Sequence, residues 1–278
     1  THGRVRATAV ITCTNLILPT HEHISLRAPS ARATETIVSR LLEVAVSDVS
    51  ARVRLQVMHC LDARFDRFLS QSHHIDEIMF LLSDDLFDIR LEALTTLGRL
   101  AKYNPAAVLP DLRQILLLLI SQIRNSHDSR TKEDASLLLC SFLRTIPFHR
   151  VVKGFTGSII QSIIAPVPST DTRLITACLE ATGELCMVLR DGMLPYVDEV
   201  LPVLIFNMQD GSSHQKQETA VRALGQLVTA TGLVISPYLR FPDLLPKALD
   251  LLLTASATPW SLRRGPPLLP GEMATSVW

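Results

Sequence analysis

Apolar residues recur along this chain at the spacing of one helix face, and the pattern returns at a fixed interval. Three segments carry a glycine among leucines late in such a helix, at Gly98, Gly183 and Gly225. Cys140 takes the same place in a fourth segment. Positions 98, 140, 183 and 225 lie 42, 43 and 42 residues apart. A constant period of this size indicates stacked helical units.

Each period has room for two helices. The first carries apolar residues at helical spacing, such as Leu91, Leu94 and Leu97. Breaks follow these helices at Pro105, Pro147, Gly192 and Gly232. After the breaks come the apolar stretches 109–123, 155–164, 194–208 and 244–253. Two helices per period favour HEAT over armadillo repeats, so the prediction is all-α, an α-solenoid of about five two-helix HEAT-type repeats (an ARM/HEAT superhelix).

The recurring glycine predicts close packing between helices. A mid-helix Gly costs roughly 1 kcal/mol relative to Ala, and helices packed about 8–10 Å apart need small side chains where they approach most closely. Replacing Gly225 with Leu is therefore expected to lower the free energy of unfolding by about 1–3 kcal/mol. In an earlier unit Asp62 takes this place, 36 residues before Gly98. We expect its neighbourhood to differ.

The pattern divides the chain into three segments. Residues 1–36 show no clear period and are interpreted as an irregular or partial-repeat N-terminal segment. Residues 37–264 form the HEAT-repeat solenoid. Residues 265–278 are interpreted as a non-repeat, disordered tail, because Pro266 and Pro267 cannot continue a helix.

Composition narrows the classes of partner. Lys+Arg and Asp+Glu both number 27, giving a net charge of zero, whereas a nucleic-acid binder would carry a basic excess. Hydrophobic residues make up 47% of the chain and aromatic residues 5%, an aliphatic composition suited to packed helices. The longest apolar run, Ile115–Ile120, falls short of the roughly 20 residues that span a bilayer. We therefore expect no membrane insertion.

The cysteines do not indicate a disulfide framework or a zinc site. They are odd in number, widely spaced and without a C-x-x-C pair: Cys13, Cys60, Cys140, Cys178 and Cys186. The interpretation is buried thiols in a reducing compartment. Cys178 and Cys186 lie eight residues apart on one apolar helical face, where core filling is favoured.

Two histidine clusters raise the question of a metal site. One is His73-His74 with Asp76-Glu77, and the other is His21-Glu22-His23 in the N-terminal segment. Adjacent histidines do not share a helix face, so polar turns are the favoured interpretation. G-x-S-x-G and P-loop motifs are absent from the sequence. We therefore predict no catalytic, cofactor-binding or metal-binding residue.

Basic residues recur at near-equivalent positions of the repeats: Arg52, Arg54, Arg90, Lys132, Arg173 and Lys216. Such a ladder could bind an acidic peptide. The favoured alternative is pairing with acidic residues in the turns of adjacent repeats, namely Asp48, Asp85, Asp128 and Asp171. Pairs of this kind are common and individually weak.

Several segments agree with one family in their loops as well as in their helical pattern. They are Arg54–Phe68, Phe87–Arg90, Gly98–Leu100, Asn104–Ala106, Ile175–Leu185 and Ala220–Pro237. In these segments the chain resembles the central HEAT region of the target of rapamycin (TOR) serine/threonine protein kinases, of the PI3K-related kinase family. The resemblance runs from about Ile37 to Arg264 and does not extend to either end.

The resemblance implies an indirect role. The family carries its kinase domain near the C-terminus of a very long chain, whereas this sequence lacks a G-x-G-x-x-G loop, a catalytic Asp–Asn pair and Asp-Phe-Gly. No kinase residue can therefore be transferred to this chain, and ATP and Mg are expected only in the parent's kinase domain. In the family, this solenoid packs between protomers and near the regulatory subunit that recruits substrates.

The resulting hypothesis is a scaffold segment of a TOR-like kinase with assembly surfaces for nutrient and growth signalling. The expected partners are TOR complex subunits and a second TOR protomer, without nucleic acid or a small-molecule substrate. A cytoplasmic location is expected, since the parent family acts there and also at endolysosomal or vacuolar membrane surfaces and in the nucleus. The alternative is a free-standing HEAT adaptor of the transport-receptor or phosphatase-scaffold type.

Overall fold

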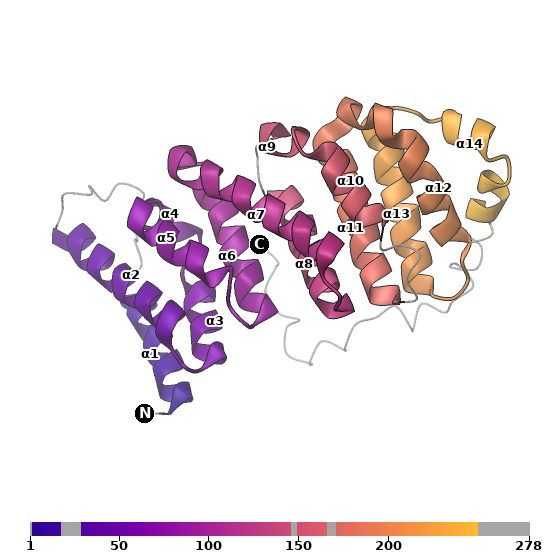
Figure 1. The fold of residues 1–278 in the computed structure, drawn as a ribbon. Helices are drawn as coiled ribbons and strands as arrows, with labels where there is room; N and C mark the ends of the chain where they lie inside the picture. Colours follow the sequence, from indigo (N-terminus) through magenta and orange to yellow (C-terminus); the bar gives the residue numbers. More distant parts are fainter. Residues whose placement is uncertain (1, 18–28, 146–148, 166–170, 250–278) are drawn as a thin grey trace, which may run out of the picture. The chain divides into compact units, whose positions relative to one another are not determined.

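The computed structural model describes residues 2–17, 29–145, 149–165 and 171–249. Within these ranges the chain forms helices joined by turns, without a strand (Figure 1). The chain divides into two compact units, Thr1–Gly232 and Leu233–Trp278. The predicted all-α solenoid is confirmed in the first unit, where helices pack side by side.

Most helices of the first unit form antiparallel hairpins joined by short turns. The first helices of these hairpins are α2 (Pro29–Ser47), α5 (Ser72–Leu81), α7 (Pro105–Asn125), α10 (Thr156–Ile164) and α12 (Val197–Gln209). Their partners are α3 (Ala51–Cys60), α6 (Phe87–Leu100), α8 (Ser129–Thr145), α11 (Thr172–Leu189) and α13 (His214–Thr231). The sequence grouped each glycine-bearing helix with the apolar helix after it, whereas the hairpins join it to the one before.

Shorter elements complete the described chain. In the first unit they are α1 (Gly3–Leu16), η1 (Ala63–Phe65), α4 (Asp66–Leu69), α9 (His149–Lys153) and η2 (Arg190–Tyr196). The second unit contains α14 (Ser236–Arg240) and helical residues 244–249, within the predicted stretch 244–253.

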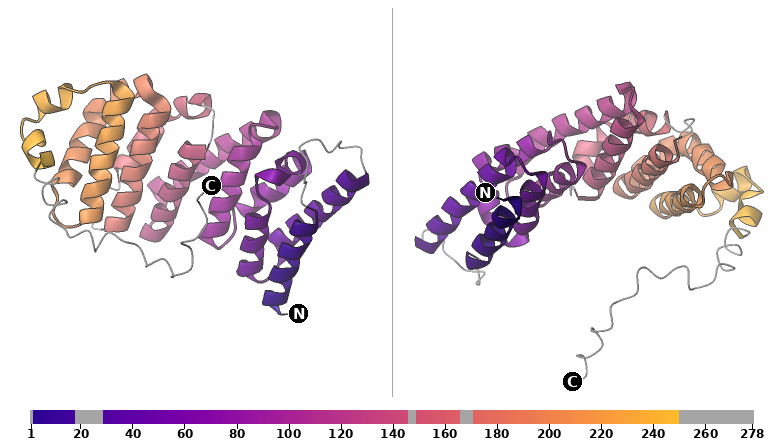
Figure 2. Two further views of the ribbon diagram at one scale, coloured as in Figure 1. Left: turned by 180° about the vertical axis from the view of Figure 1, so that it is seen from behind. Right: turned by 90° about the horizontal axis from the view of Figure 1, so that it is seen from below.

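The hairpins stack into two layers (Figure 2). One, here called the glycine layer, contains α1, α3, α6, α8, α11 and α13, each in contact with the next. The other, here called the opposite layer, contains α2, α5, α7, α10 and α12. Side chains such as Leu97, Leu116 and Leu204 are fully buried in the stack. A single hairpin would leave apolar side chains exposed to water, and stacking covers them. Each buried Leu contributes about 1.5–3 kcal/mol to stability.

Local chemistry sets the helix ends. The Asn104 side chain accepts a hydrogen bond from the Ala107 amide, and Pro105 opens α7. Gly232 adopts a left-handed conformation (φ 68°) after the last residue of α13. These two predicted breaks are confirmed. The predicted break at Gly192 falls within η2, and Pro147 lies outside the described residues.

Helix α7 is the one helix, among the residues that the structure describes, long and apolar enough to cross a membrane. Length and composition alone meet this criterion, and core helices of globular proteins meet it too. Several of its residues, including Leu112, Leu116 and Ile123, are fully buried in the stack. The expectation that the chain does not insert into membranes stays a prediction.

Two of the recurring glycines lie at close contacts between neighbouring helices. A Cβ on Gly98 would lie 2.9 Å from the Thr145 Cβ of α8. A Cβ on Gly183 would overlap the Gln226 side chain and lie 3.3 Å from the Ala223 Cα of α13. Both distances are shorter than ordinary van der Waals contact. The predicted close packing is confirmed at these two positions.

The expectation for Gly225 is wrong. A Cβ there would have no neighbouring atom within 4 Å. Gly98 and Gly183 each face the next helix of the glycine layer, and α13 is the last helix of that layer in the first unit. Gly225 therefore occupies the same position of the repeat without the neighbour that makes it a close contact.

The neighbourhood of Asp62 differs, as expected. Helix α3 ends at Cys60, so Asp62 lies beyond the helix and accepts a hydrogen bond from the Arg64 amide at the start of η1. The starts of α3 and α6 are likewise 36 residues apart, and the intervening α5 has 10 residues where α7 of the next unit has 21.

The division of the chain at residues 36 and 264 stays a prediction. Within the expected N-terminal segment, Gly3–Leu16 form α1, which packs against α3, and α2 begins at Pro29. The predicted tail 265–278 lies outside the described residues.

Gly183→Leu and Gly225→Leu form a matched pair. We expect Gly183→Leu to lower the free energy of unfolding by about 1–3 kcal/mol, because the larger side chain overlaps α13. Gly225→Leu should leave it unchanged or slightly raised, since Leu favours helices more than Gly and meets open space. Urea unfolding followed by circular dichroism measures both. Equal losses in the two variants would contradict the close contact at Gly183.

Candidate interaction surfaces

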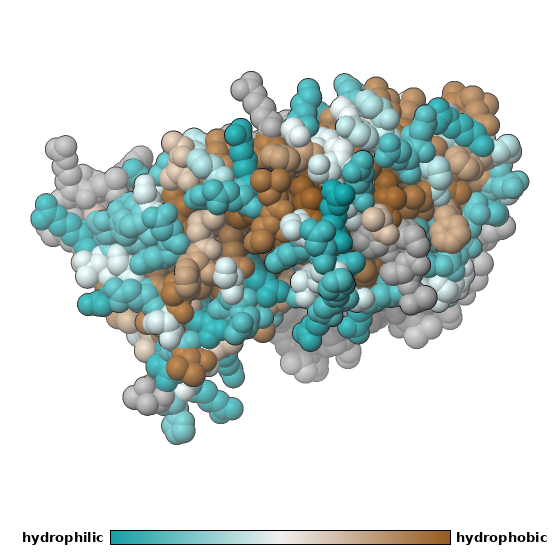
Figure 3. Space-filling view, viewed as in Figure 1, coloured by the Kyte–Doolittle hydropathy of each residue, from teal (hydrophilic) through white to brown (hydrophobic). Residues whose placement is uncertain are grey.

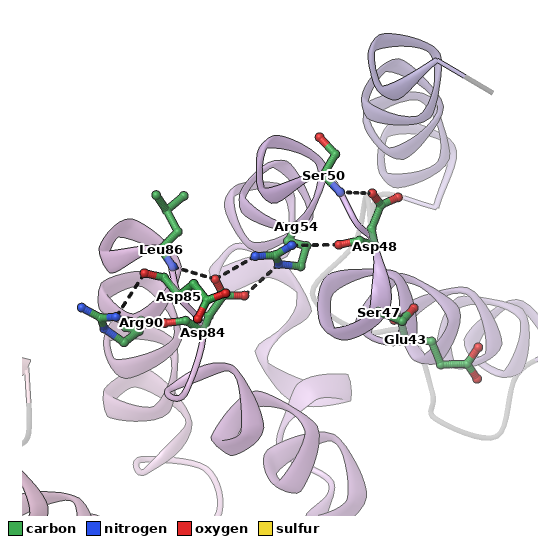
Figure 4. A network of polar contacts seen from close by, with 9 residues as sticks. All are labelled: Glu43, Ser47, Asp48, Ser50, Arg54, Asp84, Asp85, Leu86 and Arg90. Carbon is green, nitrogen blue, oxygen red and sulfur yellow. Dashed lines mark hydrogen bonds and ion pairs between the residues drawn. The ribbon is translucent and has the colours of Figure 1, made fainter.

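A ladder of arginines and aspartates connects neighbouring hairpins at their turns (Figure 4). Arg54 on α3 donates from Nε and Nη2 to both carboxylate oxygens of Asp84 in the next turn, at 2.7 and 2.9 Å. Its Nη1 donates to the Asp48 carbonyl oxygen of its own turn at 2.8 Å. Arg6 on α1 binds the Asp48 carboxylate in the same two-pronged way, at 2.7 and 2.9 Å. Each arginine therefore fixes two segments.

The ladder continues with a different acid. Arg90 on α6 donates to the Asp84 carbonyl oxygen of its own turn at 2.9 Å. Its Nη2 binds Asp134 of α8 at 2.7 Å. At the far end of the unit, Lys216 pairs with Asp210 of its own turn. The basic groups are thus held by neighbouring carbonyls and carboxylates.

The electrostatics of the ladder favour charged carboxylates. Hydrogen bonds from Arg6 lower the pKa of Asp48. Burial alone would raise the pKa of Asp84, but hydrogen bonds from Arg54 and the Leu86 amide outweigh it, and the net shift is downward. The arginines therefore stabilise the ionised form of the aspartate side chains in the turns.

Pairing with a turn acid of an adjacent repeat is confirmed for Arg54. Arg90 instead pairs with an acid on a helix, Asp134 of α8, and Lys216 pairs within its own turn. Of the expected acids, Asp48 is a partner, whereas Asp84 takes the place of Asp85. Asp128 and Asp171 instead accept amide hydrogen bonds at the starts of α8 and α11. Within the described ranges, ion pairs do not involve Arg52, Lys132 or Arg173.

A signal in the sequence could have identified the correct acids. In three turns an aspartate lies six residues before the basic residue: Asp48 and Arg54, Asp84 and Arg90, Asp210 and Lys216. Because one turn geometry repeats, this spacing brings the basic side chain back to its own turn. The partner Asp134 has no counterpart in this spacing.

His74 is a core residue and is unsuited to metal binding. It is fully buried, and its Nδ1 donates to the Phe68 carbonyl oxygen at 2.9 Å. Its Nε2 lies 2.9 Å from the Ser39 hydroxyl of α2. Both ring nitrogens are therefore engaged. In the described part of the chain, no group of three or more His, Cys, Asp or Glu side chains could hold a metal ion, and His21-Glu22-His23 lies outside it.

The cysteines divide into two groups. Cys140, Cys178 and Cys186 are buried, and burial raises their pKa values to about 11, about 11 and about 12. These thiols stay protonated and unreactive, as core filling implies. The prediction of burial is wrong for Cys13, which is exposed on α1, while Cys60 is half-buried.

An apolar cleft of about 490 Å³ lies beside α7. Leu94, Ile115, Leu118, Leu119 and Leu138 supply its apolar lining, and Arg90 and Asp134 lie at its edge. Leu118 is 55% exposed, and its neighbour in the chain, Leu117 of α7, is 49% exposed. Figure 3 shows hydrophobic surface gathered over this part of the unit. Exposed apolar residues around a cleft are typical of a protein-binding surface.

Comparison with known proteins finds related sequences along most of the chain. It is 31% identical to the serine/threonine-protein kinase TOR2 of Saccharomyces cerevisiae over 94% of its length. It is 31% identical to mTor of Drosophila melanogaster over 90%, and 32% identical to TOR of Arabidopsis thaliana over 84%. The chain spans about 10% of the length of each of these relatives. No protein-family model matches it.

Solved structures with the same fold are much more distant in sequence. Kap121p bound to the SUMO protease Ulp1p superposes with a TM-score of 0.61, at 12% identity, over 91% of this chain and 28% of Kap121p. Kap121p bound to Pho4p gives 0.60 at 12% identity, over 92% and 28%. At this identity the likeness shows the fold alone.

The buried His74 predicts a pH dependence. Burial lowers the pKa of His74, so protonation favours the unfolded chain, whose histidine titrates near 6.5. Stability contributed by neutral His74 is complete above that value and is lost as the pH falls from about 6.5 toward the lower folded pKa. The slope is at most about 1.4 kcal/mol per pH unit.

Urea unfolding between pH 7.5 and about 5 tests this, with His74→Gln expected to give the shallower pH dependence. His127 is the matched control, since it is exposed and lies in another turn, and His127→Gln should keep the slope of the unsubstituted chain. A pH slope unaffected by His74→Gln would contradict the assignment of this pH dependence to His74.

Proposed function

Because the chain belongs to the TOR family of serine/threonine-protein kinases, matching about one tenth of their length, we propose that it is a scaffold segment. Its role is to supply protein-binding and complex-assembly surfaces in nutrient and growth signalling. Phosphotransfer, with ATP and Mg, belongs to another part of the parent protein. The proposed location is the cytoplasm.

The internal use of reactive side chains supports this proposal. The ladder binds its arginines to turn carbonyls and carboxylates, His74 is engaged at both nitrogens, and three of the thiols are buried. In the described residues these polar and nucleophilic groups are engaged or buried, which supports a binding role over a catalytic one.

The observation that carries the proposal is the exposed apolar surface beside α7. Leu118 borders the cleft with more than half of its surface exposed. An exposed leucine over an apolar cleft gains most from an apolar partner side chain, which removes both from water. The proposed partners are subunits of the TOR complex and a second TOR protomer.

The alternative proposal is a free-standing adaptor. It is supported by the fold of Kap121p, whose structures include complexes with Pho4p, Nup53p and RanGTP. At 12% identity this support concerns architecture alone.

Replacing Leu118 with Glu tests the scaffold proposal. Purified chain is immobilised, and binding of purified TOR complex subunits is measured by biolayer interferometry. We expect saturable binding by at least one subunit and about a tenfold or larger loss in Leu118→Glu, since a charge would be buried in an apolar contact. Val49→Glu is the matched control, because Val49 is 96% exposed in the α2–α3 turn and should keep full affinity.

Two results would contradict the scaffold proposal. One is the absence of binding by every subunit of the complex. The other is binding of RanGTP or a transport cargo in place of those subunits, which would favour the adaptor. Phosphate transfer from ATP by the purified chain would contradict the absence of catalysis.

A further inference from the structure

The apolar cleft beside α7 lies between two inner hairpins of the first unit. Hairpin α5–α6 contacts α2 and α3 on its other side, and hairpin α7–α8 contacts α10 and α11. Both walls of the cleft therefore have described neighbours, and its opening does not result from an end of the chain. Its volume of about 490 Å³ falls within the range of about 300–1,000 Å³ of clefts that bind ligands.

Three charged residues line the cleft, and two of them are engaged within the protein (Figure 4). The Asp84 carboxylate accepts hydrogen bonds from Arg54 through both oxygens and from the Leu86 amide at 2.9 Å. The Arg90 guanidinium donates to two carbonyl oxygens of the turn, at 2.9 and 3.3 Å, and to Asp134. The hydrogen-bonding groups of these two residues are therefore used inside the protein.

The third charged residue, Asp134, keeps an open oxygen. Its Oδ2 accepts from Arg90 Nη2 at 2.7 Å, and within the described ranges its Oδ1 receives no hydrogen bond. The Asp134 side chain is 27% exposed. An ionised carboxylate oxygen accepts hydrogen bonds only, so Asp134 presents an acceptor at the edge of the cleft for a donor outside the chain.

The repeat explains why this oxygen is open. In the other ladder turns a basic residue follows the turn aspartate by six residues, whereas the residue six after Asp128 is the acid Asp134. In the next unit, the residue six after Asp171 is Ala177, which is buried and uncharged. Among the described residues, Asp134 therefore pairs with Arg90 alone.

The rest of the lining is mainly apolar. Leu94, Leu119 and Leu138 are buried and line the cleft, while Leu118 is more than half exposed. An apolar side chain that enters the cleft covers Leu118 and leaves water itself. The cleft thus combines an apolar contact with an acidic oxygen.

We infer that the cleft binds a segment of a partner protein that carries an apolar side chain next to a lysine or arginine. The apolar side chain enters beside Leu118, and the basic group donates to Oδ1 of Asp134. An acidic side chain in the place of the basic one is disfavoured, because it meets the carboxylate of Asp134. The inference rests on the proposed function, since it names the chemistry of the partner at the same cleft.

Three synthetic peptides test the inference by isothermal titration calorimetry with the full chain. They share one amphipathic sequence of Leu, Ala and Gln, in which one position next to a Leu is Lys, Gln or Glu. We expect the Lys peptide to bind about two- to fivefold more tightly than the Gln peptide, as for a partly exposed ion pair. The Glu peptide should bind most weakly. Because the chain has no net charge, a preference for Lys reports a local group.

Asp134→Asn keeps a carbonyl oxygen for Arg90 and removes the charge. It should abolish the preference for Lys over Gln and leave the affinity for the Gln peptide unchanged. Asp191→Asn is the matched control, because Asp191 is exposed in η2 and does not line the cleft; this variant should keep the preference. Leu118→Ala should weaken binding of all three peptides and keep their order. Circular dichroism of each variant shows whether the helices are retained.

Equal affinity for the three peptides, no binding of any of them, or a preference for Lys that survives in Asp134→Asn would overturn the inference. Tighter binding of the Glu peptide would also overturn it and identify Arg90 as the recognising group. Binding of TOR complex subunits that depends on Leu118 and not on Asp134 would overturn the inference and leave the scaffold proposal standing. A preference for Lys that depends on Asp134, without binding of any subunit, would support the inference and contradict the scaffold proposal.

Discussion

The structure depends on one interaction: each inner helix of the glycine layer, α3, α6, α8 and α11, packs against a helix of the layer on both sides. A single hairpin cannot provide this packing, since its helices leave one face toward the previous unit and one toward the next. Leu179 and Gly183 are buried by α13, just as Leu94 and Gly98 are buried by α8. The core of the first unit is thus a series of similar contacts between successive helices.

Ion pairs and hydrogen bonds at the turns fix how neighbouring hairpins align in this packing. An apolar face alone tolerates sliding, whereas a guanidinium that binds a carboxylate through two nitrogens and a carbonyl through a third has a narrow geometry. Arg54 makes such a set with Asp84 and the Asp48 carbonyl. The ladder thereby fixes the turns of neighbouring hairpins, and its basic groups are occupied inside the protein. Among the described residues, the surface beside α7 is apolar, and this surface supports the proposed role in assembly.

The sequence predicted the architecture well because this packing repeats. The period of 42–43 residues, the helix ends at Pro105 and Gly232, and the contacts of Gly98 and Gly183 follow from local pattern. The open space at Gly225 did not follow, since it depends on whether another helix comes next. The link between Ser39 and His74 joins residues 35 positions apart, and no helical period specifies which polar groups meet between neighbouring helices. The cleft beside α7 arises in the same way, from the meeting of two hairpins, α5–α6 and α7–α8.

Amide hydrogen exchange measured by mass spectrometry on the dilute chain tests the central claim most directly. If stability comes from neighbours on both faces, α8 and α11 should exchange slowest, and protection should fall toward α1 and α13. Protection of α13 equal to that of α11 in the dilute monomer would contradict the account, because a helix with one free face would then be as stable as one covered on both sides.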